Sequence, residues 1–182
     1  MRLALACAAV LAVGHAARAE GFVIAAQGKA LCSIAVAEQA DPAERHAAEE
    51  LAHFLGEISG ARFELVTPDR AGPASILVGR AAVLARITPQ ELSALGDEGY
   101  LVRTSAAAIA IAGNTPRGTL YGAYALLEEQ LGCRWFTPEV AHIPKLASPS
   151  FPQAICASCR RSNTAPPTTR TRAMATGPCA TT

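Results

Sequence analysis

Four residues with metal-binding chemistry recur at helical spacing in the first half of the sequence: His46, Glu49, Glu50 and His53. Spacings of three, four and seven residues put them on one side of a helix, where two imidazoles and a carboxylate could meet a metal ion. The two histidines are, however, two turns apart, or about 10 Å along a helix, which is too far for one ion. The pattern therefore indicates a solvated polar face, and we predict no metal site and no cofactor.

Arg117 is a candidate for binding an anionic group. Thr115 suits the N-cap of a helix and Pro116 suits its first position, so Arg117 is predicted to lie in the first turn. The free N–H groups and the dipole at that helix end favour a negative charge, such as the carboxylate of a uronate. The alternative, which we favour, is a buried ion pair of Arg117 with Asp97 or Glu98 that fixes this domain against a neighbouring one.

Trp135 is the second candidate ligand-binding residue, because its ring could stack on a sugar. Tyr121, Tyr124 and Phe136 lie close to it in the sequence. Helical spacing and a position directly after the helix suit these rings better to a core, or to contact with a neighbouring domain. Sugar stacking stays open as the alternative.

The sequence contains six cysteines, but only Cys32 and Cys133 lie in the part of the chain that is expected to fold. After export these two could form one disulfide, although spacing alone does not determine the pairing. Cys156 and Cys159 form a C-x-x-C pair with no nearby histidine and no second pair, so neither a metal nor a redox role is predicted for them.

The N-terminus has the pattern of a secretory signal. Arg2 supplies a positive start, Leu3 to Val13 form an apolar stretch, and Ala17 to Ala19 fit an A-x-A cleavage site. The stretch is well short of the roughly 20 apolar residues that span a bilayer. We therefore expect residues 1–19 to be a signal peptide and the mature protein, from Glu20, to be soluble and secreted or periplasmic, with no membrane partner.

The rest of the chain divides into two parts of different composition. Residues 20–150 carry 10 Lys and Arg against 15 Asp and Glu, with regular apolar periodicity, as a globular domain does. Residues 151–182 contain four Arg, no acidic residue, four Pro and seven Thr. Such a segment cannot bury enough surface to offset its ordering entropy, so we expect a disordered tail. Four Arg without interleaved aromatic residues do not indicate nucleic-acid binding.

Two long helices are predicted, one from Asp41 to Gly60 and one from Thr115 to Gly132, because both runs have capping residues, an amphipathic face and a terminal glycine. Short β-type runs surround them: Phe22 to Ala26, Leu31 to Val36, Phe63 to Val66, Ser75 to Val78, Gly99 to Arg103, Ala107 to Ala112, Arg134 to Phe136 and His142 to Pro144. The first two runs, and the fifth and sixth, are expected to form hairpins. The predicted fold class is α+β, with several hairpin-linked strands and two long helices packed on one face of a sheet.

The run from Asn114 to Pro138, NTPRGTLYGAYALLEEQLGCRWFTP, resembles the motif RGTLYGxYxLLExxLGCRWFTP that closes the N-terminal domain of bacterial α-glucuronidases, just before their barrel. The segments LAHFLGEISG, SILVG and DEGYLV resemble the accessory domain that precedes the barrel in α-glucuronidases and bacterial β-hexosaminidases. The resemblance implies that residues 20–150 form a non-catalytic, hexosaminidase-accessory-domain-like fold, a mainly antiparallel sheet with two long helices packed on one face, whose partner is a glycosidase-like barrel. The catalytic carboxylates of those enzymes lie in the barrel, so the resemblance identifies no catalytic residue in this chain.

In these relatives a PAFEYR-type segment leads from the accessory domain into the barrel. A neighbouring reading frame of the back-translated tail spells a similar segment, which predicts a frameshift near Phe151 that truncates a longer protein. We therefore expect the accessory domain of a secreted glycoside hydrolase that acts on uronate-bearing or amino-sugar-bearing glycosides. One alternative is a free-standing carbohydrate-binding module of the periplasm, which needs an exposed aromatic platform. Another is a pseudogene product with an exposed apolar surface that would face the barrel.

Overall fold

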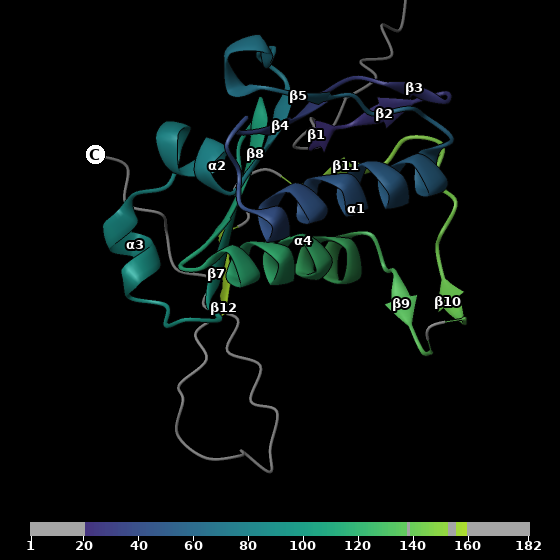
Figure 1. Ribbon diagram of the computed structural model, residues 1–182. Coiled ribbons are helices and arrows are strands. Elements are labelled where there is room, and N and C mark those ends of the chain that lie inside the picture. The colour runs from purple at the N-terminus through teal and green to yellow at the C-terminus, as the bar shows by residue number, and fades with distance from the viewer. Residues whose placement is uncertain (1–20, 138, 153–155, 160–182) are drawn as a thin grey trace, which may run out of the picture.

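Figure 1 shows a computed structural model of the chain, which describes residues 21–137, 139–152 and 156–159. The predicted signal peptide lies outside these residues. The helices are α1 Pro42–Ser59, α2 Arg80–Ala85, α3 Pro89–Ser93 and α4 Pro116–Gln130, with a 3-10 turn at Pro68–Arg70. The strands are β1 Phe22–Val23, β2 Ala25–Ala26, β3 Lys29–Ala30, β4 Ser33–Val36, β5 Leu65–Val66, β6 Ser75–Val78, β7 Tyr100–Thr104, β8 Ala108–Gly113, β9 Arg134–Trp135, β10 Ala141–His142, β11 Ser150–Phe151 and β12 Cys156–Cys159.

A six-stranded sheet in the order β12-β7-β8-β6-β4-β5 forms the centre of the fold. β4 is parallel to β5 and β6, and β6 is parallel to β8. In contrast, β7 is antiparallel to both β8 and β12. The mixture of helices and strands is as predicted, but the prediction of a mainly antiparallel sheet is wrong, because this sheet is mixed.

The parallel strands at the centre are buried on both faces. All four residues of β6 and the first five of β8 are buried, as expected for parallel strands that helices cover on both sides. The long helices α1 and α4 cover one face, as predicted, and the short helices α2 and α3 cover the other (Figure 1). The sequence pattern did not predict α2. Without this helix the second face of the sheet was expected to lie in solvent, which is typical of an antiparallel sheet.

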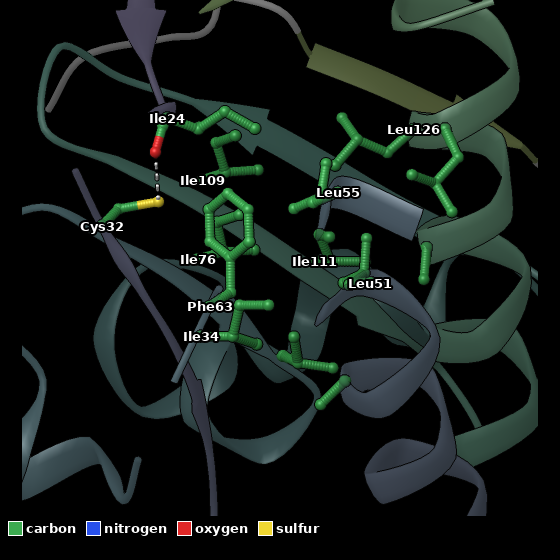
Figure 2. Close-up of a cluster of buried hydrophobic side chains, with 14 of the residues drawn as sticks. Ile24, Cys32, Ile34, Leu51, Leu55, Phe63, Ile76, Ile109, Ile111 and Leu126 are labelled. Atoms are coloured by element: carbon green, nitrogen blue, oxygen red, sulfur yellow. Dashed lines mark hydrogen bonds between the residues drawn. The ribbon is translucent and has the colours of Figure 1, made fainter. Parts of the chain in front are cut away.

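Side chains alternate between two core clusters along the central strands. Figure 2 shows Ile34 and Ile76 of the sheet in the cluster that includes Leu51 of α1 and Leu126 of α4, and each of these side chains is at most 2% exposed. Ala35, the next residue along β4, belongs to the cluster on the opposite face, with α2 and α3. This two-sided burial holds the four helices against one sheet.

Both long helices begin and end at the predicted residues. Asp41 caps α1 by accepting a hydrogen bond from the N–H of Ala43 (2.9 Å), and Gly60 ends that helix in the left-handed conformation with a φ of 71°. Thr115 caps α4, and Gly132, with a φ of 78°, follows its last turn. Only glycine adopts this conformation at little cost, so the two glycines fix where the helices stop.

Glu44 connects the starts of two helices on opposite faces of the sheet. Its carboxylate accepts hydrogen bonds from the backbone of Asp41, at the start of α1, and of Arg80, at the start of α2. Gly79 leaves room for it, since a Cβ at that position would come within 2.3 Å of Glu44 Cδ. Burial raises the pKa of Glu44 above its usual value. This contact supplies the cap that α2 lacks in its own sequence.

One of the two predicted hairpins is confirmed. β7 and β8 pair from Tyr100 opposite Gly113 to Thr104 opposite Ile109. The other hairpin is smaller than predicted, because only β2 and β3 pair, across a turn at Gly28. The residues that follow form β4, which leaves the hairpin and joins the central sheet beside β6.

The chain after α4 returns to the N-terminal strand. β11 pairs with β1, with Phe151 opposite Phe22, and the Phe151 side chain is fully buried. Thr104 Oγ1 donates a hydrogen bond to the carbonyl of Pro152 (2.9 Å), and β12 pairs with β7. Residues 151–152 and 156–159 therefore belong to the fold, contrary to the predicted disordered tail. Residues 153–155 and 160–182 lie outside the described residues, and there the tail and the frameshift stay predictions.

Replacing Phe151 by alanine should lower the free energy of unfolding by about 3–5 kcal/mol, because the change removes a fully buried ring. Urea denaturation of the purified chain measures this. Phe136→Ala is the matched control, since that ring is 69% exposed, and should change the free energy by less than about 0.5 kcal/mol. Equal effects of the two substitutions would place residue 151 outside the core.

Candidate functional site

Arg117 lies in the first turn of α4, as predicted, and its side chain is exposed. Thr115 caps this helix by accepting a hydrogen bond from the N–H of Gly118 (3.3 Å), and it donates one to the carbonyl of Asp97 (2.5 Å). Arg117 is exposed in this domain by itself, so the burial that we expected for its ion pair with Asp97 or Glu98 does not arise within the domain, and a contact of Arg117 with a neighbouring domain stays a prediction. A role for Arg117 in binding an anion stays a prediction.

Trp135 lies in β9, and its half-buried ring belongs to an aromatic cluster. The ring centroid is 5.1 Å from that of Phe54 in α1, at an interplanar angle of 75°. It is 5.2 Å from that of Tyr124 in α4, at 85°. These edge-to-face contacts are favourable for aromatic pairs. They connect both long helices to the strand that follows them, and the rings are not coplanar, so they do not form a flat platform for a sugar.

A hydrogen bond crosses from α4 to α1 beside this cluster. The Tyr124 hydroxyl donates to Glu50 Oε2 at 2.5 Å. Burial, followed by the hydrogen bond to Glu50, raises the pKa of Tyr124 to about 12. The hydroxyl therefore stays protonated near neutral pH and remains a donor, which makes this contact a structural link between the helices.

Arg117 and Trp135 do not form one site. Arg117 lies in the first turn of α4, whereas Trp135 lies in β9 after its last turn, and this helix has 15 residues and is therefore about 22 Å long. Both residues belong to the sequence run from Asn114 to Pro138, but the helix between them separates their side chains. Each has to be considered as part of a different surface.

The tip of the β9–β10 hairpin is apolar and exposed. Phe136 is 69% exposed and Val140 is 54% exposed, and the N–H of Phe136 donates to the carbonyl of Val140 (2.9 Å). Figure 1 shows this hairpin beyond the end of α4, apart from the central sheet. Sequence reasoning identified Phe136 as aromatic but did not predict that it would be exposed next to Val140, because this follows from the turn between them.

The polar side of α1 lies in solvent. His46, Glu49 and His53 are exposed, and His53 Nε2 lies 3.9 Å from Glu57 Oε1. In the part of the chain that the structure describes, no group of three or more His, Cys, Asp or Glu side chains is placed to hold a metal ion. Among the helices of that part, α1 included, none is long and apolar enough to cross a bilayer.

Cys32 and Cys133 are both buried free thiols, so the disulfide that the sequence left open is not formed. The Cys32 thiol donates to the carbonyl of Ile24 at 3.7 Å (Figure 2). Burial raises the pKa of Cys32 to about 12 and also raises that of Cys133. Neither thiol ionises near neutral pH, so neither has the chemistry of a reactive cysteine.

An open hollow of about 670 Å³ lies between the β2–β3 hairpin and the residues before β5 and β6. Lys29, Arg62 and Glu64 line it, and all three are exposed. Ser33 and Ala74, which also line it, mark the N-terminal ends of β4 and β6, whereas open parallel sheets usually bind ligands outside the carboxyl ends of their strands. The hollow contains neither Arg117 nor Trp135. The sequence did not indicate it, because Lys29, Arg62 and Glu64 have no regular spacing along the chain.

Residues 21–126 match the model of a protein family described as the glycosyl hydrolase family 67 N-terminus. The chain belongs to this family. The match covers the parallel strands, most of the two core clusters and most of α4, and it ends before Trp135. The predicted resemblance to an N-terminal accessory domain of glycoside hydrolases is thereby confirmed. A search of curated proteins found no match.

A solved α-glucuronidase contains a domain of similar fold, and two solved hexosaminidases align with lower scores. A GH115 4-O-methyl-α-glucuronidase, BtGH115A, with specificity for decorated arabinogalactans, aligns with a TM-score of 0.57 and 18% identity, over 75% of this chain and 18% of that chain. The GH20 β-N-acetylhexosaminidase from Streptomyces coelicolor aligns with a TM-score of 0.48 and 18% identity, over 76% and 24%. The β-hexosaminidase of Streptomyces plicatus gives 0.47 and 20%, over 75% and 22%. The family 67 N-terminal chain thus spans between 18% and 24% of these proteins.

Tyr124→Phe should lower the free energy of unfolding by about 1 kcal/mol, because it removes the hydroxyl that donates to Glu50 between α1 and α4. In a double-mutant cycle with Glu50→Gln, the two effects should fall short of additivity by about 1 kcal/mol in urea denaturation. Glu49→Gln is the control, because the neighbouring Glu49 is exposed and its effect should add to that of Tyr124→Phe. Additivity in both cycles would show that the hydrogen bond contributes nothing.

Proposed function

We propose that this chain is a non-catalytic accessory domain that packs against the catalytic region of a secreted glycoside hydrolase. The observation that carries the proposal is the family match over residues 21–126, which includes every strand of the central sheet except β12 and most of both helix layers. In the GH115 α-glucuronidase the aligned segment is 18% of that chain, so a domain of this fold is there a minor part of a larger protein. We propose hydrolysis of uronate-bearing or amino-sugar-bearing glycosides as the reaction of the catalytic region.

A non-catalytic role is supported by what the carboxylates contact. Glycosidases use a pair of carboxyl groups that face one sugar from two sides. Here Glu44 caps two helices, Glu50 accepts from Tyr124, and Glu91 forms an ion pair with Arg103 at 2.5 Å. The pKa of Glu91 is lowered mainly by the hydrogen bond from the backbone of Thr88 and next by the hydrogen bond from Arg103. This carboxylate therefore stays ionised. Each of these groups supports the fold.

The aromatic residues favour an accessory role over a free-standing carbohydrate-binding module. A sugar-binding platform needs exposed rings that lie in one plane. The ring of Trp135 stands nearly perpendicular to that of Tyr124, at 85°, and is half-buried between the helices and β9. Its contacts are those of a residue that fixes the hairpin to the domain.

The purified chain should bind a catalytic region and hydrolyse no glycoside by itself. The binding partner is the catalytic region of a family 67 glycosyl hydrolase, expressed without its own N-terminal domain and immobilised for biolayer interferometry. We expect saturable binding in the micromolar range or tighter, and no turnover of aryl glucuronides or aryl N-acetylglucosaminides.

The enzyme's own N-terminal domain is the positive control, because its binding shows that the immobilised region is folded. If that domain binds and this chain does not, the proposed partner is wrong. Turnover by the chain alone, at a rate proportional to its concentration over several preparations, would contradict the non-catalytic role.

Export is the second part of the proposal, and the apolar stretch from Leu3 to Val13 followed by Ala17 to Ala19 supports it. Expressed in a Gram-negative host, the protein should be recovered from the periplasm or the medium, and N-terminal sequencing should begin at Glu20. Ala19→Arg should block cleavage, because the position before the cut requires a small side chain. A cytoplasmic protein that retains residues 1–19 would contradict export.

A further inference from the structure

The hollow beside the β2–β3 hairpin is lined by two cationic side chains, Lys29 of β3 and Arg62 of the segment before β5. Both are exposed, and in the part of the chain that the structure describes neither side chain forms a hydrogen bond or an ion pair. Residues 20–150 carry 15 acidic and 10 basic side chains. The hollow, with two cations and the carboxylate of Glu64, is therefore positive on a domain that is negative as a whole.

The extended segment before β5 directs Arg62 toward the hollow. Phe63 is 6% exposed and packs in the core, whereas its neighbours Arg62 and Glu64 are exposed and line the hollow. Successive side chains of an extended segment point to opposite sides, so Arg62 and Glu64 lie on the same side, with Cα atoms about 7 Å apart. The N–H of Ile34 donates to the carbonyl of Glu64 (2.9 Å), which fixes this segment beside β4.

The β2–β3 hairpin forms another side of the hollow, and its turn is held in one conformation. Gln27 and Gly28 have positive φ angles of 49° and 72°, which is the pattern of a two-residue turn that matches the twist of its strands. The N–H of Gln27 donates to the carbonyl of Ala147 (3.1 Å), so the returning chain supports the turn. Lys29 follows this turn directly, and little backbone freedom would be lost when a ligand enters.

The usual ligand position of a parallel sheet is already filled in this domain. Open sheets bind ligands outside the carboxyl ends of their strands. At that end, after β6, the Glu44 carboxylate accepts hydrogen bonds from the starts of α1 and α2 and leaves no room for a Cβ at Gly79. The hollow lies at the other end, where Ser33 and Ala74 mark the starts of β4 and β6, and this end is open.

The side chains of the hollow suit an acidic sugar. Lys29 and Arg62 can donate to a carboxylate, and Glu64 can accept from a hydroxyl. Leu31, which is 51% exposed, offers an apolar surface to the C–H groups of a sugar ring. A neutral sugar would leave both cations without a partner, and a nucleic acid would bring several phosphates close to Glu64, which disfavours a polyanion.

We propose that this hollow binds a uronate unit of a polysaccharide, with Lys29 and Arg62 on its carboxylate and Glu64 on a hydroxyl. The inference rests on the proposed function, and it selects the uronate-bearing glycosides from the two classes proposed there. The domain then holds the polysaccharide next to the catalytic region, and hydrolysis stays in that region.

The test is a titration of the purified full chain with methyl α-D-glucuronide, followed through its backbone amide signals by heteronuclear NMR. We expect saturable binding in the millimolar range, with shifts of the amides of residues 28–33 and 62–64. Methyl α-D-glucoside has the same ring without the carboxylate, and it should bind at least about tenfold more weakly, because the contacts of both cations are lost.

Lys29→Gln and Arg62→Gln should each weaken binding of the glucuronide about fivefold or more, because each removes a charged donor. Both residues are exposed, so the melting temperature should not change. Arg70→Gln is the matched control, since Arg70 is exposed in the 3-10 turn at Pro68–Arg70 and does not line the hollow. Its affinity for the glucuronide should equal that of the unmodified chain.

The outcomes separate this inference from the proposed function, because the titration needs no catalytic region. Absence of saturable binding, or equal affinity for the glucoside, would overturn the inference and leave the accessory role in place. Equal weakening by Arg70→Gln would overturn it as a general effect of charge. Inorganic phosphate that binds as tightly, or loss of binding in Arg117→Gln alone, would also overturn it, in favour of a general anion site or of the start of α4. Conversely, uronate binding by a chain that does not bind the catalytic region would support the hollow and contradict the proposed partner.

Discussion

Burial of the central strands on both faces is the constraint on which the rest of the structure depends. A parallel strand that is covered on one face only would leave an apolar row in water, and β6 is buried at all four residues, including the apolar run Ile76 to Val78. The chain therefore needs a helix layer on each side, and it supplies two long helices on one side and two short ones on the other. The capping contact of Glu44 joins the two layers across the end of the sheet.

The packing of α4 on the sheet explains Gly113 and the first glycine of the RGTLYG segment, Gly118. A Cβ at Gly113 would lie 2.3 Å from the backbone of Gly118, and a Cβ at Gly118 would lie 2.4 Å from the carbonyl of Gly99. The start of α4 therefore lies against the ends of β7 and β8 at a distance that only glycine permits. Thr119, which is buried, accepts a hydrogen bond from the N–H of Gly113 at 3.0 Å and fixes this approach. A motif that identifies the family thus consists largely of packing residues.

The features that could be predicted from the sequence are those whose signals are local. The caps of α1 and α4 lie next to the helices they start, so both helices were predicted to within a residue or two. α2 was missed because its N-cap is Gly79, and the side chain that satisfies it is Glu44, 35 positions earlier in the sequence. Pairing of Phe151 with Phe22 is similarly distant, and a single ring in a polar segment gives no periodic signal. The uninterrupted apolar run Ile76 to Val78 was the available sequence sign of a parallel sheet, since a strand with one face in water alternates apolar and polar residues.

For the candidate site residues too, features that depend on neighbouring residues in the sequence were predicted, and features that depend on distant residues were not. Arg117 was placed correctly in its helix turn, but its exposure depends on where Asp97 and Glu98 lie in the fold. In the segment RWFTP, Arg134 binds the carbonyls at the end of α4 and Trp135 packs between the helices. Phe136 is the large side chain of this segment that remains exposed. The packing of the domain therefore accounts for Arg134 and Trp135, and it leaves the Phe136 ring in solvent.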